Sequence, residues 1–600
     1  MCGIIGYTGR KYAPEILIQG LKKLEYRGYD SAGIAVSKNE NTIICKKRGK
    51  VGELEKKVAE LDFSGAVCGI GHTRWATHGE PSDTNSHPHS GGKNVTLVHN
   101  GIIENYLELK DELAQKGYHP ISQTDTEIGA MLIDSMYEGD PLKAIYGAIA
   151  KIHGSFAFGI MFKDYPDTIY AVRRDSPLII GVGEGENFIA SDIPAILPYT
   201  KKYYLSDEDE VAVVKKHGVS FFDRDGKEIR KRLLTATWDE QSAQKSGYKH
   251  FMLKEIYEQP KVIAATVNAY KNGNELFENC SFDFNIKGKI HIVACGSAMH
   301  AALLGKSAIE KLARIPVSVE IASEFRYDNP ILGKDDVVVA ISQSGETADT
   351  LAAVRLAKSE GIRTLGIVNV WGSTLAREAD DVIYTYAGPE ICVATTKAYL
   401  CQTAVLDMIA LKLGRAVMGK EEYEKQVELL DTLPDYITKA LETDAYCKEL
   451  ADKNLSEEHE FYIGRGQDYC VCTEASLKLK EVSYVHSEAY AAGELKHGTI
   501  SLITDGTPVV AVMTERARIA KTVSNIKEVA SRGASVICVT YDDIDVSDFC
   551  KNKIVIDTPS EFFAPIIANI PLQLYAYHIA DGRGNDVDKP RNLAKSVTVE

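Results

Sequence analysis

Cys2 is the residue best placed for chemistry in the first half of the chain. It becomes the N-terminal residue once Met1 is removed, as is usual when a small side chain follows. An α-amine titrates at about pH 8, so at neutral pH it can take the proton of a thiol on the same residue without a histidine. The plain alternative is a buried cysteine at the start of a strand. The weight of Cys2 as a candidate nucleophile therefore depends on its surroundings.

Three motifs after Cys2 contain the groups that a glutamine-hydrolysing site needs. They are GHTRWATHGEPSDTNSHPH at 71–89, VHNG at 98–101 and SQTDTE at 122–127. Arg74 would hold the α-carboxylate of glutamine, and Asp125 would hold its α-ammonium. The Asn100 side-chain amide and the Gly101 backbone N–H would donate to a tetrahedral oxyanion. Taken singly, these motifs also fit a surface Arg–Asp pair and an Asn-Gly turn.

Five histidines fall within 28 residues of the same region and raise the question of a metal ion. They are His72, His78, His87, His89 and His99. Their spacing fits no zinc signature, and no cysteine or carboxylate completes a set of ligands. The sequence favours hydrogen bonding of these side chains in loops, and we expect no metal.

A second candidate site begins after the apolar run DDVVVAI, in the segment SQSGET at 342–347. Hydroxyls, an amide and backbone N–H groups at the start of a helix form an anion cradle, because the free donors and the helix dipole both favour a phosphate. The turn 295–297 follows another strand of the same domain, and open α/β sheets bind ligands at the carboxyl ends of their strands. An ordinary Ser/Thr helix cap is the alternative. The pattern predicts a monophosphate site.

A third group of polar residues lies in CTEASLKLKEVSYVHSEAYAAGELKHG at 472–498, which is expected to be helical. Glu474, Lys478 and Glu481 are spaced i, i+4, i+7 and would share one face. For this spacing alone, a solvated charged stripe is the better explanation. However, flanking apolar positions would bury part of the helix, and Glu481 with His497 offers a carboxylate and an imidazole suited to moving protons on a sugar.

Different elements are expected to position these groups. Up to about residue 240, short β-rich runs alternate with glycine-rich turns, and helical stretches such as 14–25 and 104–116 are fewer. This predicts an α+β domain with extensive sheet. The polar segment 236–247 is the expected linker. From about 290, near-continuous apolar strands alternate with long helices, which is typical of a parallel doubly wound sheet.

The second half contains an internal duplication. Apolar runs begin near residues 292, 337, 364 and 382, and again near 462, 509, 535 and 554, so that each offset is within a residue or two of 171. A fixed period of this kind indicates a repeated structural unit. We therefore expect two α/β domains followed by a polar C-terminal tail.

Composition narrows the classes of function. The 600 residues, with 44% hydrophobic and 26% charged side chains, are ordinary for a globular chain of several domains. The net charge of −15 disfavours a nucleic-acid partner. Scattered cysteines, no basic leader and no long apolar run predict a cytoplasmic protein without disulfides or a membrane span. The segment GRAVMGKE at 414–421 misses a P-loop at Glu421 and lacks the preceding strand, so no ATP site is expected.

The motifs MCGIIGY, LEYRGYDSAGIA, GHTRWATHG, NGIIENY and TDTE resemble the class II, N-terminal-cysteine glutamine amidotransferases. The duplicated half resembles the SIS (sugar isomerase) family. The whole chain is similar to the glutamine–fructose-6-phosphate aminotransferase (isomerizing) family. The resemblance implies an α+β Ntn-hydrolase sandwich followed by two α/β doubly wound SIS domains. It implies Cys2 as nucleophile, Asn100 and Gly101 as oxyanion hole, and a glutamine pocket of Arg74, Thr77, His78 and Asp125.

For the second half, the resemblance implies Glu481 as the base that moves a proton between C1 and C2 of the sugar. His497 would act in ring opening, with Lys478 and Glu474 in support. Lys595, in NLAKSVTVE, resembles the lysine that forms a Schiff base with the C2 carbonyl of fructose 6-phosphate. Without the resemblance it would be a solvated lysine of the tail.

The phosphate contacts implied by the resemblance come from Ser297, Ser342, Gln343, Ser344, Thr347 and Thr395. Ala298 stands where the family usually has a hydroxyl, and Thr395 where it usually has a serine, so the detailed contacts are in doubt. Trp75 resembles the aromatic residue that gates an ammonia channel. An ordinary packed tryptophan is the alternative.

The expected domains are an amidotransferase domain at 2–240, a linker and helical lead-in at 241–284, SIS domains at 285–425 and 450–585, and a catalytic tail at 586–600. The expected reaction uses glutamine and fructose 6-phosphate, gives glucosamine 6-phosphate and glutamate, and requires no metal or organic cofactor. The resemblance also implies a homodimer, in which His497 can serve the neighbouring subunit's site. The alternatives are an amidotransferase acting on another sugar phosphate and a sugar-phosphate-sensing regulator.

Overall fold

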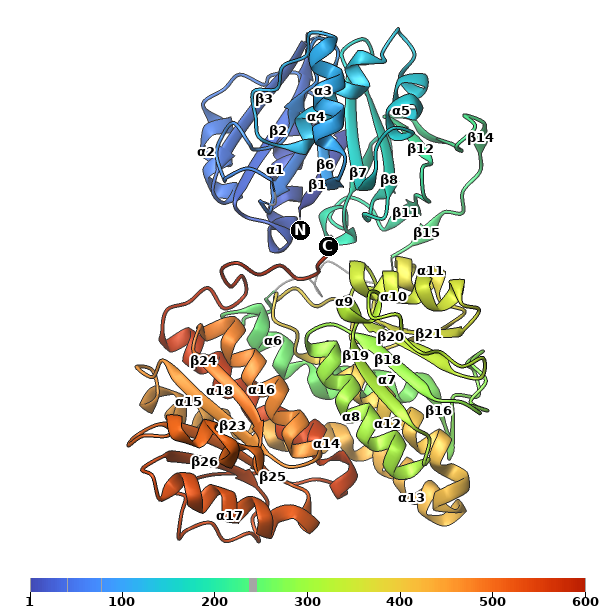
Figure 1. Ribbon diagram of the computed structural model, residues 1–600. Coiled ribbons are helices and arrows are strands. Elements are labelled where there is room, and N and C mark those ends of the chain that lie inside the picture. The colour runs from blue at the N-terminus through green and yellow to red at the C-terminus, as the bar shows by residue number, and fades with distance from the viewer. Residues whose placement is uncertain (1, 40, 77, 237–244, 599–600) are drawn as a thin grey trace. The chain divides into compact units, whose positions relative to one another are not determined.

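The computed structural model describes residues 2–39, 41–76, 78–236 and 245–598 (Figure 1). The chain divides into two compact units. The first comprises Met1–Ala243 together with the C-terminal segment from Ala594, and the second comprises Gln244–Leu593. Most of the expected linker, residues 237–244, lies outside the described residues.

The first unit is built on two antiparallel sheets. One has the order β15-β11-β9-β10-β1-β4-β2-β3 and the other β14-β13-β12-β8-β7-β6-β5. The first sheet consists of β15 Leu234–Thr235, β11 Lys202–Leu205, β9 Ile179–Val182, β10 Asn187–Ala190, β1 Gly3–Thr8, β4 Cys68–Arg74, β2 Ser31–Lys38 and β3 Asn41–Arg48. The second consists of β14 Glu228–Ile229, β13 Gly218–Phe222, β12 Val211–Lys215, β8 Thr168–Arg174, β7 Gly154–Phe162, β6 Val95–Ile103 and β5 His89–Ser90.

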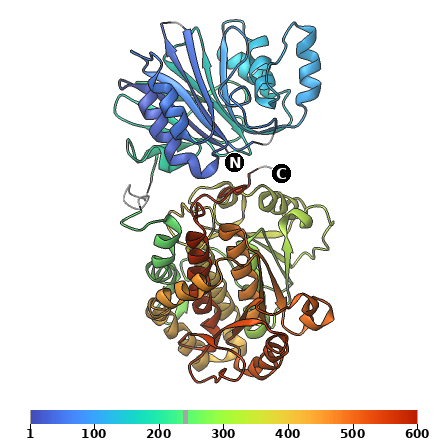
Figure 2. The same ribbon diagram turned by 90° about the vertical axis from the view of Figure 1, so that its left-hand side faces the viewer.

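Helices cover the outer face of each sheet. Figure 2 shows the dark-blue helices on one side of the strands and the light-blue helices on the other. They are α1 Ala13–Leu24 and α2 Val51–Ala59 on one face, and α3 Tyr106–Gln115, α4 Asp125–Ser135 and α5 Pro141–Ile149 on the other. A third apolar core, which includes Ile4, Val98 and Ile189, lies between the two sheets. Central strands such as β1 are buried on both faces for this reason, and the expected α+β sandwich is confirmed.

The second unit contains two parallel five-stranded sheets of the same order, β19-β18-β20-β21-β22 and β24-β23-β25-β26-β27. The first comprises β18 Ile290–Ala294, β19 Val317–Ile321, β20 Val337–Ser342, β21 Arg363–Val368 and β22 Asp381–Tyr384. The second comprises β23 His459–Gly464, β24 His486–Ala491, β25 Pro508–Met513, β26 Ser535–Thr540 and β27 Asn552–Val555. The structure therefore confirms the predicted doubly wound architecture, and the eight predicted strands recur as β18, β20 to β23 and β25 to β27.

The two sheets share one continuous apolar core. Its helices are α8 Ser297–Leu312, α12 Lys397–Met418, α16 Gln467–Ser483 and α18 Ala564–Gly582, whereas α10 Ala348–Ser359 and α17 Ile519–Ala530 cover the outer faces. The prediction of one long helix over 472–498 is wrong beyond Ser483. The helix ends there because Tyr484 adopts a left-handed conformation, and the chain then forms edge strand β24.

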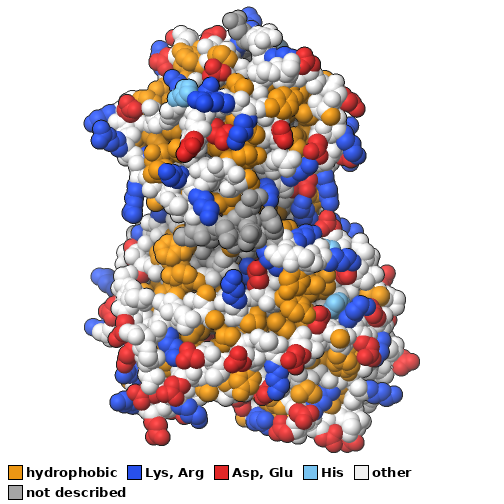
Figure 3. All heavy atoms as spheres, turned by 180° about the vertical axis from the view of Figure 1, so that it is seen from behind, with side chains coloured by type: hydrophobic (Ala, Val, Ile, Leu, Met, Phe, Trp, Pro, Cys, Tyr) orange, Lys and Arg blue, Asp and Glu red, His pale blue; other side chains and the backbone are white. Residues whose placement is uncertain are grey.

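Charges of both signs are mixed on the face of the molecule that Figure 3 shows. In Figure 3, lysine and arginine side chains are interspersed with aspartate and glutamate over the visible face of each unit. Within the described ranges, none of the helices combines the length and the apolar character needed to cross a bilayer.

Candidate active sites

Cys2 directly precedes β1, and neighbouring strands hold it from two sides. Its Sγ lies 3.3 Å from the backbone N and 3.5 Å from the backbone O of Trp75, at the end of β4. Its carbonyl oxygen accepts hydrogen bonds from Asn100 Nδ2 at 3.0 Å and from Arg27 Nε at 3.2 Å. These hydrogen bonds place the candidate nucleophile, Cys2, next to Asn100 of the candidate oxyanion hole and next to Trp75, the candidate gate.

The thiol of Cys2 needs a base. Burial raises the pKa of Cys2, and the nearby cations Arg74 and Arg27 offset that rise only in part. A thiol with a raised pKa is a poor nucleophile until a neighbouring group takes its proton. The α-amine of Cys2 itself, once Met1 is removed, is the group that the chain supplies for this.

The residues of the candidate oxyanion hole lie on β6. Asn100 is 4% exposed, and its side-chain nitrogen also donates to Ser191 Oγ at 2.9 Å. Gly101 has φ +128°, and a Cβ placed there would lie 2.1 Å from the carbonyl oxygen of Ser155. Only glycine fits this position.

The candidate glutamine-binding residues lie around the same point. Arg74, at the end of β4, is buried, and its guanidinium donates to the carbonyl oxygens of His78 and of Gly79, the latter at 3.0 Å. Asp125 opens α4, and its Oδ2 accepts the backbone N–H of Ile103 at 2.8 Å. The loop bonds of Arg74 have to yield if its guanidinium is to bind a carboxylate. Thr77 lies outside the described residues.

The loop 342–347 joins β20 to α10 and presents hydroxyls at a helix start. Ser342 Oγ lies 2.9 Å from Thr347 Oγ1 and accepts Gly345 N–H at 3.0 Å. Ser344 Oγ accepts Glu346 N–H at 3.2 Å. The side chain of Thr347, the N-cap residue of α10, makes no cap hydrogen bond, so an ordinary Thr cap does not explain this sequence. The first backbone N–H groups of a helix have no partner within the helix and can bind an anion.

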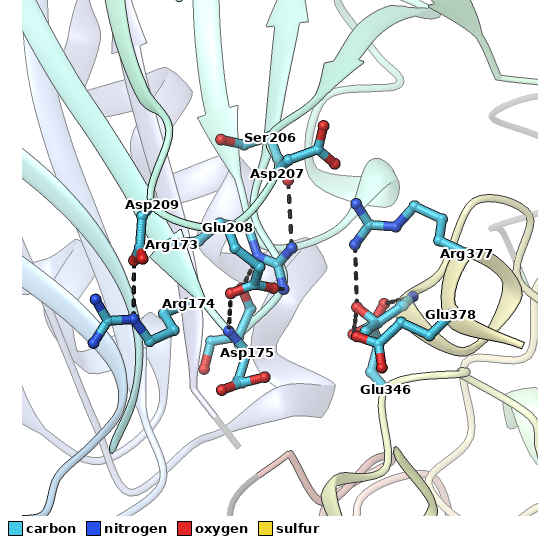
Figure 4. Close-up of polar contacts among 12 residues, drawn as sticks. Arg173, Arg174, Asp175, Ser206, Asp207, Glu208, Asp209, Glu346, Arg377 and Glu378 are labelled. Carbon is cyan, nitrogen blue, oxygen red and sulfur yellow. Dashed lines mark hydrogen bonds and ion pairs between the residues drawn. The ribbon is translucent and has the colours of Figure 1, made fainter. Parts of the chain in front are cut away.

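The start of the short helix α11 Thr374–Glu378 braces this segment. Both carboxylate oxygens of Glu346 accept hydrogen bonds from Thr374, at 2.9 Å from its N–H and 2.8 Å from its Oγ1. Arg377 Nη2 donates to the same Oγ1 at 3.2 Å, and Figure 4 shows Arg377 and Glu346 pointing toward each other. Thr374 thereby engages the one acidic side chain of an otherwise neutral loop.

A buried network connects α8 of the first sheet to α16 of the second. Glu474 accepts Ser297 Oγ at 2.9 Å, lies 2.8 Å from His300 Nδ1 and pairs with Lys478 at 3.5 Å. Lys478 also contacts Glu481. Glu474 and Lys478 are both 0% exposed, which rules out a solvated stripe. Burial opposes the charge on Lys478, but Glu481 and Glu474 outweigh it and raise the pKa of the ammonium.

The comparisons with known proteins agree with this division. A model described as "Glutamine amidotransferase domain" matches residues 72–198, and the SIS domain model matches residues 284–412 and 455–580. Chains named glutamine–fructose-6-phosphate aminotransferase [isomerizing] from Clostridium tetani and Caldanaerobacter subterraneus are 52% and 49% identical, over 100% of this chain and of each relative. The chain belongs to the glutamine–fructose-6-phosphate aminotransferase family. It is therefore an enzyme of the family's class.

A solved relative of this aminotransferase family covers the second unit. The C-terminal domain of glucosamine-fructose-6-phosphate aminotransferase from Francisella tularensis is 38% identical, with a TM-score of 0.56 over 57% of this chain and 99% of that structure. The fold of two SIS domains is thereby matched by an experimental structure.

Not every predicted residue of the aminotransferase joins these clusters. His497, at the end of the short helix Glu494–His497, is exposed, and within the described chain it makes no hydrogen bond to the Glu481 network. Lys595 belongs to the C-terminal segment that groups with the first unit. Ala298 packs against the apolar core, and Thr395 is partly buried.

Sequence reasoning missed two members of the aminotransferase sites. Ser191, after β10, accepts hydrogen bonds from Asn100 Nδ2 and from Ile4 N–H. His300 lies one helical turn after Ser297 on α8 and reaches Glu474. The i, i+3 spacing of Ser297 and His300 was the one available signal, whereas Ser191 comes from a distant strand.

Proposed function

We propose that this chain hydrolyses glutamine at Cys2 and transfers the ammonia to fructose 6-phosphate, giving glutamate and glucosamine 6-phosphate. The proposal rests on the sequence identity of 52% and 49%, over the full length, with two chains named glutamine–fructose-6-phosphate aminotransferase [isomerizing]. The geometry adds support, since a partly buried cysteine whose backbone carbonyl accepts an amide N–H lies in the first unit and a buried acid–base network lies in the second.

In the proposed glutaminase step, the Cys2 α-amine takes the thiol proton, and Sγ attacks the side-chain carbonyl carbon of glutamine. Asn100 Nδ2 and the Gly101 N–H stabilise the oxyanion. Ammonia leaves with the proton from the amine, and water then hydrolyses the thioester to glutamate. Arg74, with Thr77 and His78, would hold the α-carboxylate end, and Asp125 would hold the α-ammonium.

In the proposed sugar step, the phosphate is bound at the N-terminus of α10 by Ser342, Gln343, Ser344 and Thr347, with Ser297 and Thr395 beside them. Lys595 forms the Schiff base at C2, and ammonia replaces it. Glu481 then moves a proton between C1 and C2. The Lys478 ammonium, held between two carboxylates, fixes the position of Glu481.

We propose the domains 2–240, 285–425 and 450–585, with a lead-in at 241–284 and a catalytic tail at 586–600. We also propose a homodimer, because the exposure of His497 would let it serve a neighbouring subunit. All twelve cysteines are free thiols, which fits a reducing cytoplasm.

Trp75 is proposed to gate ammonia transfer. Its backbone contacts the Cys2 thiol, and its ring packs edge-on against Tyr29, with ring centroids 6.0 Å apart. We therefore expect a displacement of the Cys2 thiol to shift the Trp75 backbone and, with it, the Trp75 ring. Trp75→Ala should release ammonia to solvent while glutamine hydrolysis continues, which would lower amino sugar formed per glutamate. An unchanged ratio would contradict this function.

Incubation of the chain with glutamine and fructose 6-phosphate, followed by assay of glutamate and amino sugar, tests the main proposal. Equal amounts of glutamate and glucosamine 6-phosphate are expected. Glutamate without amino sugar would overturn it, and a panel of other sugar phosphates would then identify a different acceptor. Full synthase activity in Lys595→Ala would disprove the Schiff base. A wild-type chain that binds fructose 6-phosphate but forms no amino sugar would instead be a sugar-phosphate sensor.

A further inference from the structure

His72 lies in the middle of β4 and is fully buried. Its Nε2 is 2.9 Å from the carbonyl oxygen of His99 and 3.1 Å from Oδ1 of Asn100. The imidazole therefore contacts the far end of the side chain whose amide nitrogen faces Cys2. The proposed glutaminase mechanism gives His72 no part.

The contacts of His72 define its tautomer. A backbone carbonyl can only accept a hydrogen bond, so Nε2 of His72 must carry the proton. The Asn100 atom beside Nε2 must then be the oxygen. The amide nitrogen of Asn100 consequently faces the Cys2 carbonyl oxygen at 3.0 Å and Ser191 Oγ at 2.9 Å. A flip of the amide would bring together Nε2–H and N–H, which are both donors.

The surroundings keep His72 neutral. Burial lowers the pKa of His72 to about 3. Its ring stacks on the ring of His87, with centroids 4.0 Å apart and planes at 16°, and burial also lowers the pKa of His87. Arg74 is close enough to oppose a positive charge on either ring. The donor at Nε2 is thus constant over the pH range in which the enzyme would work.

We propose that His72 is a positioning residue, whose Nε2–H locks the Asn100 amide with its nitrogen toward Cys2. The inference rests on the proposed glutaminase function. Ser191 does not set the orientation, because a hydroxyl can either donate or accept. The Cys2 carbonyl oxygen, which only accepts, holds the nitrogen end of the amide, and His72 Nε2–H holds the oxygen end. Without the His72 contact the amide is held at one end only and can more readily turn its oxygen toward the oxyanion, where a lone pair opposes the negative charge that a donor would stabilise.

A double-mutant cycle on the full chain tests the inference. The variants are His72→Phe, which keeps a ring but loses the donor, Asn100→Ala, and the two combined. His72→Gln is the conservative variant, because its amide N–H can replace the lost donor. Steady-state glutamate release gives kcat and KM for each. Circular dichroism and thermal unfolding of each variant verify that it is folded.

Removal of one oxyanion donor typically lowers kcat about 10²-fold, and we expect this of Asn100→Ala. His72→Phe should lower kcat at least tenfold with KM nearly unchanged, and His72→Gln should recover much of the loss. The double variant should be no slower than Asn100→Ala, because His72 acts through Asn100 alone.

Multiplied losses in the double variant, or a normal kcat in His72→Phe, would overturn the inference and leave the proposed function standing. A wild-type chain that releases no glutamate would overturn both.

Discussion

The two sheets of the second unit have the same strand order, but the equivalent loops at the carboxyl ends of their strands have different contacts. In each, the first strand runs through a glycine of nearly equal φ into a helix, Gly296 at +56° before α8 and Gly466 at +58° before α16. In the first sheet, the adjacent loop presents the hydroxyls of Ser342, Ser344 and Thr347. In the second, the equivalent loop begins at Thr514 and is already occupied by a carboxylate of the chain itself.

That carboxylate is Asp468. It accepts the backbone N–H groups of Thr514 at 2.9 Å and Glu515 at 3.2 Å, together with the Thr514 hydroxyl at 2.5 Å. In the second sheet, the donors at this position hold the carboxylate of Asp468. In the first sheet, the donors of the equivalent loop are the ones for which we propose an external anion, the substrate phosphate. Under this proposal the duplication created two anion positions, of which the second sheet fills its own and contributes α16 with Glu474, Lys478 and Glu481.

The largest expected effect comes from the helix that the second sheet contributes. Glu481→Gln should lower the kcat of amino sugar formation about 10²- to 10⁴-fold, the usual contribution of a general base. Affinity for fructose 6-phosphate should change little, because the phosphate is held elsewhere. Steady-state kinetics with a direct binding measurement checks both, and a comparable loss of affinity would mean that the two sheets do not divide these roles.

A smaller effect is expected at the open loop. Ser344→Ala combined with Thr347→Val removes two hydroxyls, and hydrogen bonds to charged groups contribute about 1.5–3 kcal/mol each. At the lower end of this range, two such bonds amount to about 3 kcal/mol, so we expect the KM for fructose 6-phosphate to rise at least roughly 100-fold, with glutamine hydrolysis at Cys2 intact. Ser359→Ala, on the exposed end of α10, is the matched control. An unchanged KM would place the phosphate elsewhere.

The brace behind that loop should matter less. Thr374→Val removes the hydroxyl that engages Glu346, and Thr374→Ser retains it. We expect the valine variant to raise the KM for fructose 6-phosphate several-fold, with kcat nearly unchanged, and the serine variant to behave as wild type. Equal KM values in the two variants would show that Glu346 needs no partner.

The smallest effect on the sugar reaction is expected from Asp468→Asn, whose kinetics should match wild type within about twofold. Its effect is on stability. Burial raises the pKa of Asp468 from 3.8 to about 6. The folded state therefore holds this proton to a higher pH than the unfolded state, so stability is lost as pH rises from about 4 to 6, by about 3 kcal/mol.

Thermal unfolding of the full chain between pH 4 and 7 measures this dependence. The wild type should lose stability relative to Asp468→Asn across that interval. A difference in stability between wild type and variant that does not change with pH would show that burial does not raise the pKa of Asp468. Weaker binding of fructose 6-phosphate by the variant would contradict the separate roles of the two sheets.

Much of this architecture could be predicted from the sequence. Buried parallel strands appear as apolar runs, and in the second half the same series of runs occurs twice. Edge strands β19 and β24 were missed, since strands such as His486–Ala491 carry polar residues on a half-exposed edge. Cys2 as nucleophile and the acid–base role of α16 stay predictions, which rest on sequence context and the family resemblance, because type and spacing alone favoured a buried cysteine and a solvated charged stripe. Asp468 and Ser191 were not, because their partners come from distant strands and local sequence carries no trace of them.

The most direct test of the divided roles is a calorimetric titration with fructose 6-phosphate, carried out on Glu481→Gln so that no turnover occurs. We predict one sugar phosphate bound per chain, with affinity lowered when Ser344→Ala and Thr347→Val are added and unchanged when Asp468→Asn is added. Two molecules bound per chain, or full affinity without the two loop hydroxyls, would contradict the account.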